Sequence, residues 1–474
     1  MNKPTAHAEH CGSTQRPHAA KPICHQRGAA SLVVVMVLFF LMALVAAYTS
    51  RNLIFEQRTS VNQYRATQAF EAAEAGLEWA LAQLNGGRID AQCLEAGAAN
   101  TDTSFRQRYL NINTNPAPDP LSGMVTVPLQ GSAGTPPRRA GCVWNGSGWT
   151  CSCPIDSDPA LTAPVGSGVY PAFWISFSSN LVTRPGVVQI VATGCTRLDA
   201  TCLASTNATA NVEGRALVTA VVALKSAIAT PPAAALTVLR GVAGGGPGTL
   251  TAENTNVGVG GVTIQAGGLV PDISSFTLRS IPGTPGSASV IQGDNSLSDL
   301  LAPFPADLAV AGHVPSDRVF ASTFGAWPNV VKWQPAALRL NCPAGGCRQA
   351  LTDAVAKNPD RIIWIDGDLT LESGGDIGSP PDPADPTVAG PTTIIATGNL
   401  IVTAGGAGSR IFGLVYARGG NWTGSGEIQG AAFTEGDLAA TANQTVVYDG
   451  AVLDSLRLRA GSFVRIPGSW RDFQ

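Results

Sequence analysis

The residues best suited to chemistry in this sequence are carboxylates that stand close to glycines near its C-terminal end. They are Asp366, Asp368, Glu372, Glu435 and Asp437. Two carboxylates at a fixed separation can hydrolyse a glycosidic bond. Asp366, Arg418 and Glu435 each directly precede a glycine, so we expect them along one edge of a series of turns. Charged residues at such turns are usually solvated, and we predict no catalytic residue among them.

Metal and cofactor sites are not expected either. Four of the five histidines precede residue 29, and His313 alone follows it, which disfavours a multi-histidine metal site. Asp366-Gly-Asp368 resembles the start of a calcium loop, but the third ligand position fails. The glycine-rich stretch 241–248 lacks the Lys-Ser or Lys-Thr of a phosphate-binding loop. Only 13% of residues are charged, with a net charge of −3, so no nucleic-acid partner is expected.

Eight cysteines follow the N-terminal 28 residues and predict disulfides in an oxidising compartment. Short loops separate two pairs, for which we predict the bonds Cys195–Cys202 and Cys342–Cys347. Two further bonds would use the other four, with connectivity left open: Cys93, Cys142, Cys151 and Cys153. Zinc is the competing interpretation, but one residue between Cys151 and Cys153 is too few for a usual ligand pair.

The element that must position everything else is one long helix. Ala29 to Ser50 carries no charge and is long enough to span a bilayer. The segment before it is basic, so we expect this leader in the cytoplasm and the bulk of the chain exported. Arg51 to Leu84 contains no proline, and an apolar stripe recurs there at steps of three and four residues. The stripe consists of Phe70, Ala73, Leu77, Ala80, Leu81 and Leu84.

Two other interpretations of the apolar run are open. A secretory signal would be cleaved after a shorter apolar core, for example near Ala46. A plain membrane anchor with a helical stalk would keep residue 1.

The amino-acid sequence of this segment resembles that of a known family. RGAASLVVVMVLFFLMALVAAYTSRN, followed by QAFEAAEAGLEWAL, is similar to the N-terminal region of PilX-type pilus assembly proteins, which are minor type IV pilins. The resemblance implies that a prepilin peptidase cuts between Gly28 and Ala29 and that Ala29 is then N-methylated. It also implies other minor and major pilins as partners, and a path from the inner membrane, with the bulk in the periplasm, to the surface pilus.

One position departs from the family's usual pattern. Pilins that form the bulk of a fibre carry Glu at the fifth mature position, which here is Val33. That carboxylate is thought to neutralise a neighbour's N-terminal amine, because a lone buried charge is costly. We therefore expect this chain at a fibre tip or in an initiating complex, with adhesion to a surface or host ligand as a further hypothesis.

The exported part is expected to be α+β. Alternating runs near Phe173, Val188 and Leu217–Leu224 predict antiparallel strands packed on the helix stripe. Thr230-Pro231-Pro232 marks a boundary, after which the composition becomes glycine-rich. We divide the chain into a leader, a transmembrane and amphipathic helix, a disulfide-bearing head and a glycine-rich β region: 1–28, 29–85, 86–228 and 229–474.

A weak repeat in the last region predicts a β-solenoid. Four blocks each place a short strand before a glycine: Ile362–Leu369, Thr393–Leu400, Leu414–Asn421 and Ala431–Leu438. Repeated strands and glycine turns favour stacked β coils, and a glycine-rich β-sandwich is the alternative. We expect Arg348–Lys357 to form a short helix before the first coil.

The favoured function is therefore a non-enzymatic minor pilin. Two alternatives remain: a pseudopilin of a type II secretion system, and a membrane-anchored β-helix enzyme acting on polysaccharide.

Overall fold

The computed structural model describes most of the chain from Arg27 onward. It forms two compact units, one up to Gln63 and one from Tyr64. The described residues are 27–97, 102–112, 125–126, 138–155, 157–166, 169–178, 187–198, 202, 214–244, 249–306, 312–343, 345–382, 388–402, 409–440 and 443–472.

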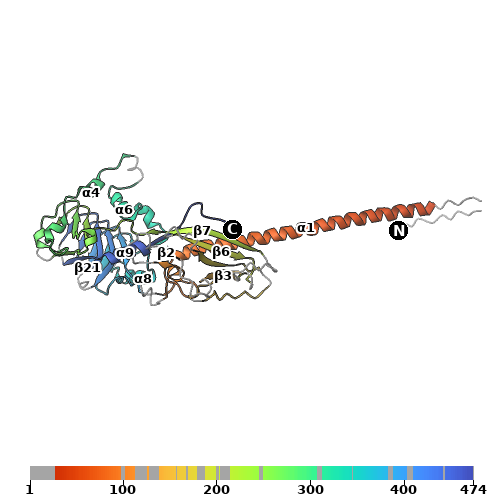
Figure 1. Cartoon of the computed structure of the whole chain (residues 1–474), viewed down its shortest axis with the longest axis horizontal. Coiled ribbons are helices and arrows are strands. Elements are labelled where there is room, and N and C mark those ends of the chain that lie inside the picture. Colours follow the sequence, from red (N-terminus) through yellow and green to blue (C-terminus); the bar gives the residue numbers. More distant parts are fainter. Residues whose placement is uncertain are drawn as a thin grey trace, which may run out of the picture. The chain divides into compact units, whose positions relative to one another are not determined.

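Helix α1 (Arg27–Leu84) confirms the predicted long helix (Figure 1). The observed helix begins two residues before the predicted beginning at Ala29. It ends where Asn85 and Gly86 donate hydrogen bonds back to the last helical turn. The predicted stripe is buried at Ala73, Leu77 and the related positions Ala80 and Leu84, each at most 2% exposed. Phe70 and Leu81 are partly buried beside it.

The stripe packs on a six-stranded antiparallel sheet, which we call the head sheet (Figure 1). Its strand order is β24-β7-β6-β5-β3-β4. In chain order the bounds are β3 (Ala140–Trp144), β4 (Trp149–Ser152), β5 (Ala172–Ser178), β6 (Val187–Cys195), β7 (Arg215–Ser226) and β24 (Gly461–Arg465). The predicted alternating strands are thus confirmed, and Phe173, Ile190 and Val218 contribute to the shared core.

Glycine lets the helix approach this sheet closely. A Cβ atom on Gly194 of β6 would overlap the backbone of Ala69 and Ala73 in α1. A Cβ atom on Gly76 of α1 would lie 2.8 Å from the Phe173 ring. Backbone therefore faces backbone at this contact, which side chains would hold apart. Smaller elements beside the helix are α2 (Phe105–Tyr109) and the antiparallel pair β1 (Asn111–Ile112) and β2 (Val125–Thr126).

Parallel strands dominate residues 227–460, which we call the stack. Its largest sheet follows the order β12-β10-β23-β21-β19-β17-β15-β14, with β8, β11 and β13 branching from β21. These strands are β8 (Leu236–Val238), β10 (Leu250–Glu253), β11 (Ile264–Ala266), β12 (Thr277–Arg279), β13 (Val290–Ile291), β14 (Ala337–Leu340), β15 (Ile362–Ile365), β17 (Thr392–Ala396), β19 (Arg410–Ala417), β21 (Gly426–Thr434) and β23 (Gln444–Tyr448).

Two smaller parallel sheets lie across the turns from this one. One has the order β16-β18-β20 and the other pairs β22 with β9. Their strands are β9 (Val242–Ala243), β16 (Leu369–Leu371), β18 (Leu400–Val402), β20 (Trp422–Thr423) and β22 (Leu438–Ala439). Aliphatic side chains such as Ile363, Leu369 and Leu400 fill the space enclosed by these strands.

The predicted sequence blocks stack in register. Ile362 pairs with Thr393, Thr393 with Leu414, and Leu414 with Ala431, which are the first residues of the four blocks. The glycine turns follow in step, because Gly398 donates to the Gly367 carbonyl and Gly419 to the Gly398 carbonyl, at 2.7 and 2.8 Å. A Cβ atom on Gly398 would lie 2.6 Å from the carbonyl carbon of Gly367, so these turns have no room for a side chain.

The side chain after three of the four turn glycines links its coil to a neighbouring coil. Asp368 Oδ1 accepts from the backbone nitrogen of Asn399 at 2.6 Å, and Asn399 Oδ1 accepts from that of Asn421 at 3.1 Å. Asp437 Oδ1 likewise accepts from the backbone nitrogen of Gly241 at 3.0 Å. Polar turn residues of the sequence thus satisfy backbone donors in the neighbouring coil.

The stack does not follow chain order from end to end. The chain enters at β8 and proceeds to β11 and β13, then crosses to the opposite end and returns from β14 to β21, beside β8. The crossing and the ends contain short helices and 3-10 turns. They are η1 (Val257–Val259), η2 (Ile273–Ser275), η3 (Gly286–Ser289), α4 (Asn295–Ser298), η4 (Asp299–Leu301), α6 (Asp317–Phe324), α7 (Pro328–Lys332), α8 (Arg348–Lys357) and α9 (Gly450–Arg459).

Helix α8 has the bounds expected from the sequence. The predicted division at residues 228 and 229 follows the end of β7, but β24 returns from the C-terminal region to the head sheet. The division into domains stays a prediction.

Candidate functional site

The first unit offers an apolar helix surface. Side chains on all sides of α1 are exposed between Leu32 and Tyr48, including Phe39 at 73%. The helix is long and apolar enough to cross a membrane, with a mean hydropathy of 2.9 over its most apolar window. The apolar helix of a signal sequence can reach the same hydropathy. Thr49 Oγ1 donates to the Val45 carbonyl at 2.9 Å, so this hydroxyl needs no partner outside the helix. Lipid or other apolar helices would suit such a surface.

The predicted processing residues lie at the beginning of this helix. Gly28 and Ala29 fall in the first turn of α1, and the leader residues 1–26 lie outside the described part of the chain. Val33 is 57% exposed on the apolar segment. The first carboxylate after Ala29 is Glu56, well beyond the apolar run. Cleavage and methylation stay predictions.

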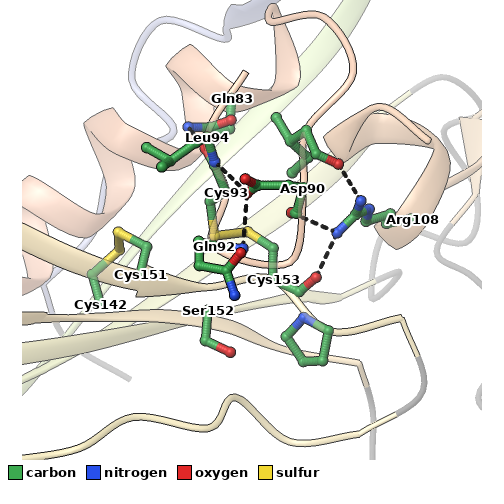
Figure 2. The surroundings of a disulfide bond; sticks show 12 residues. Gln83, Asp90, Gln92, Cys93, Leu94, Arg108, Cys142, Cys151, Ser152 and Cys153 are labelled. Atoms are coloured by element: carbon green, nitrogen blue, oxygen red, sulfur yellow. Dashed lines mark hydrogen bonds between the residues drawn. A yellow bond between two sulfur atoms is a disulfide. The ribbon is translucent and has the colours of Figure 1, made fainter. Parts of the chain in front are cut away.

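In the second unit, a disulfide fixes the loop that follows α1 to the head sheet. Cys93 is bonded to Cys153, with Cα atoms 5.3 Å apart (Figure 2). The Cys153 backbone nitrogen donates to the Ala91 carbonyl at 2.8 Å. Asp90 Oδ1 accepts from the backbone nitrogens of Gln92 and Leu94, both at 2.9 Å, which tightens the turn at the cysteine.

A buried arginine holds the same loop from the other side. Arg108 Nη1 donates to the carbonyls of Asp90 and Cys153 at 2.9 and 2.6 Å, and its Nη2 donates to that of Ile89 (Figure 2). Burial lowers the pKa of Arg108, against the opposing charge of Asp102 at 3.9 Å. Because the guanidinium satisfies buried carbonyls, its role is structural rather than reactive.

The remaining disulfides are local. Cys142 is bonded to Cys151 directly across β3 and β4, and Figure 2 shows this pair close to Cys93–Cys153. The structure also joins Cys195 to Cys202 and Cys342 to Cys347, the two pairs expected from the sequence. The connectivity of the other four could not be read from spacing, because a fold decides which cysteines meet.

The carboxylates considered for catalysis are mostly engaged in structural bonds. Asp366 Oδ1 accepts from Lys332 Nζ at 2.8 Å and from Trp364 Nε1 at 3.0 Å. Glu372 accepts from the backbone nitrogen of Arg348 at 3.1 Å. Asp368 and Asp437 accept from neighbouring coils, as described above. These contacts give each of the four carboxylates a structural partner, and the absence of a catalytic role stays a prediction.

Glu435 lies instead in a buried ionic cluster. Arg418 Nε is 3.0 Å from Glu435 Oε1, and Tyr416 donates to the same oxygen at 3.0 Å. Arg418 also pairs with Asp317, whose Oδ2 lies 3.2 Å from His313 Nδ1. Burial raises the pKa of the Glu435 carboxyl, and burial followed by the charge of Glu435 raises the pKa of Tyr416.

The sequence predicted that Arg418 and Glu435 lie along one edge of the turns. It gave no signal for Asp317 or His313, which lie between β13 and β14 in what we call the crossing segment. Arg418 lies between the two carboxylates and pairs with both, so the cluster is suited to holding α6 on the stack. Within the described ranges, no group of three or more potential ligands could hold a metal ion.

Comparison with known proteins identifies the N-terminal segment. Residues 27–78 match a family model described as PilX N-terminal. No match was found among curated proteins. Among solved structures, the competence-associated pilin ComZ from Thermus thermophilus is 12% identical, with 86% of this chain and 97% of that chain covered and a TM-score of 0.20.

A TM-score this low does not establish a shared fold, so the assignment rests on the family match over residues 27–78. The matched residues begin with α1 and extend into its striped half. The resemblance predicted from the sequence is confirmed there: residues 27–78 form a PilX-type N-terminal region.

Proposed function

We propose that this protein is a minor pilin of a bacterial type IV pilus and that it has no catalytic activity. A prepilin peptidase would cut after Gly28, and Ala29 would become the methylated N-terminus. Before assembly, the chain would be anchored in the inner membrane with most of its residues in the periplasm. It would then assemble with other pilins into the fibre. The observation that carries the proposal is the PilX N-terminal match on a helix whose first half is apolar on every side.

The apolar half of α1 supports assembly through helix packing. Exposed side chains such as Leu38, Phe39 and Phe40 would leave lipid for contact with neighbouring pilin helices. Val33 offers no carboxylate to a neighbour's N-terminal amine, which supports a place at the tip or in an initiating complex. The stack would then be displayed at the end of the fibre, where it could contact a surface or host ligand.

We further propose that the stack is a short β-solenoid. In-register parallel strands, repeated glycine turns and an aliphatic interior support this description. Its repeats give an extended display surface without requiring a catalytic site.

The first experiment is mass spectrometry of the N-terminal peptide from membranes and sheared pili. We expect a methylated N-terminus at Ala29, and the matched variant Gly28→Val should keep Met1. A wild-type chain that begins near Tyr48 would be an ordinary secreted protein. An intact Met1 in the wild type would indicate a plain anchor, and either result would overturn the proposal.

The tip hypothesis has its own test. A Val33→Glu variant should redistribute the protein along the fibre, which immunogold labelling of sheared pili would show. Val33→Leu is the matched control and should keep the wild-type distribution. Unchanged pilus number and tip occupancy in Val33→Glu would argue against the tip assignment.

A further inference from the structure

The apolar core of the head and the two apolar cores of the stack use different parts of the chain. The chain passes from the head core to a stack core between Val222 and Ala227, and it returns between Ala460 and Phe463. The head core contains buried residues between Ala73 and Val222, together with Phe463. One stack core begins at Ala227 and ends at Ala460, and the other lies within that interval. Among the described residues, no buried member of either stack core belongs to the head core.

These two points lie side by side. Ser226 at the end of β7 pairs with Gly461 at the beginning of β24. The Ala227 backbone nitrogen donates to the Ala460 carbonyl at 2.8 Å, and Ser226 Oγ donates to the Arg457 carbonyl at 2.6 Å. The intervening residues therefore leave and re-enter the head through one pair of adjacent strands.

The C-terminal segment is an integral part of the head. Phe463 is 1% exposed, and its backbone nitrogen and carbonyl bond the Asn85 side chain at 2.8 and 3.0 Å. The Ile466 nitrogen donates to the Val221 carbonyl at 2.9 Å. Trp470 then packs edge-on against Phe70 of α1, with ring centroids 6.1 Å apart.

Several of the contacts between head and stack are polar. The Arg88 backbone nitrogen donates to the Lys357 carbonyl at 2.7 Å, and Arg88 Nε donates to the Ala356 carbonyl at the same distance. Arg106 Nη1 donates to the Arg459 carbonyl at 3.2 Å, while its Nε and Nη2 bond the head itself at Leu84 and Gly461. Water can replace hydrogen bonds of this kind when the two parts are separated.

We infer that residues 227–460 are a module inserted into the head, and that the head folds without it. The head then consists of 64–226 and 461–472. On the proposed function, the helix and head are the part that assembles into the fibre, and the inserted module is the part that is displayed.

The test replaces residues 227–460 of the full chain with Asn-Gly, a pair suited to a two-residue hairpin turn. We expect a protein that keeps a cooperative thermal transition and the bonds Cys93–Cys153 and Cys142–Cys151, by calorimetry and peptide mapping. A chain ending at Ser226 is the matched control and should lose the transition. If the replaced chain has no cooperative transition in two turn designs, the inference is overturned.

The full chain provides a second measurement. Gly398→Val should crowd the Gly367 turn and lower the thermal midpoint of the stack, with no shift in that of the head. A joint shift of both transitions would also overturn the inference. A replaced chain that folds but is not processed at Ala29 would refute the pilin proposal and leave the inference intact.

Discussion

The head and the stack are stabilised in different ways. In the head, distant segments meet: helix α1 packs on strands that range in the chain from β3 to β24, and Cys93 is bonded across 60 residues to Cys153. In the stack, adjacent coils repeat one pattern, and its disulfide Cys342–Cys347 spans only 5 residues. Two of the buried arginines also differ, because Arg106 donates to carbonyl groups whereas Arg418 pairs with carboxylates.

On the proposed function, this difference separates an assembly part from a display part of the same chain. The head depends on a few long-range contacts, any of which is hard to replace. Most contacts in the stack join neighbouring coils that repeat one pattern, so its stability is close to a sum over coils. Substitutions in the two regions should therefore lower the free energy of unfolding by different amounts and with different dependence on pH.

The largest effect is expected from the buried arginines. Arg418→Met leaves Asp317 and Glu435 buried without a cation, which should lower the free energy of unfolding of the stack by about 3–5 kcal/mol at pH 7. Denaturant titrations of the detergent-solubilised chain would measure it. Burial raises the pKa of the Glu435 carboxyl and the charge of Arg418 opposes that rise, so the carboxyl of the variant should bind a proton more tightly than that of the wild type. The loss should therefore shrink as the pH falls towards the carboxyl's ordinary range.

The matched head variant is Arg106→Met. Burial lowers the pKa of Arg106 to about 10, and its guanidinium donates to the neutral carbonyls of Leu84, Arg459 and Gly461. Its loss should cost roughly 3 kcal/mol, with little change as the medium is acidified from neutral pH. The same pH dependence in both variants would contradict the comparison.

Disulfide removal should rank by loop length. Cys93→Ser with Cys153→Ser opens the longest loop and should lower the free energy of unfolding by about 4 kcal/mol. Cys342→Ser with Cys347→Ser should cost about 2 kcal/mol on the same entropic scale. Calorimetry of both double variants checks the order, and a larger loss in the stack would reverse it.

Glycine substitutions compare the close contacts of the two regions. Gly194→Val would push α1 off the head sheet, and Gly398→Val would separate two coils. Each should cost about 1–3 kcal/mol, but only Gly194→Val should expose the Phe173 ring. Near-ultraviolet circular dichroism of the aromatic side chains would distinguish them. Gly375→Val is the control, since nothing lies within 4 Å of the position that a Cβ atom would take there.

The smallest effect is expected at Asp366. The hydrogen bond from Lys332 lowers the pKa of this carboxyl, so its stabilising contribution is present above the ordinary carboxyl pKa and is lost as the pH falls through the folded value. The side chain is half-exposed, and Asp366→Asn should cost about 0.5 kcal/mol at pH 7. A deficit that persists in a urea titration at a pH where the carboxyl is fully protonated would contradict this assignment.

Local patterns accounted for much of the fold. The stripe through Ala73 and Leu77 predicted one face of α1, because helical spacing alone decides which residues share it. The blocks beginning at Ile362 and Thr393 predicted adjacent strands, because equivalent positions of stacked repeats pair in register. The helix Arg348–Lys357 was likewise evident from its own residues.

Contacts that depend on distant segments could not be predicted in this way. Nothing in Gly461–Arg465 distinguishes a strand of the head from a further strand of the stack. The branch of β8 from β21 and the approach of Asp317 to Arg418 also arise only when the crossing segment is in place. For the site, the apolar helix was readable, whereas the bond Cys93–Cys153 required the structure.

The route of the chain through the stack has a consequence for the export that we propose. Gly241 in the first coil bonds Asp437 in the last, 196 residues later. If the chain is exported as proposed, the edges of β8 and β9 have no strand to pair with on that side until the later coil has crossed the membrane. Unpaired strand edges promote aggregation, and contacts between distant residues form slowly. The protein should therefore need a holding chaperone in its folding compartment for most of the time that its translocation takes.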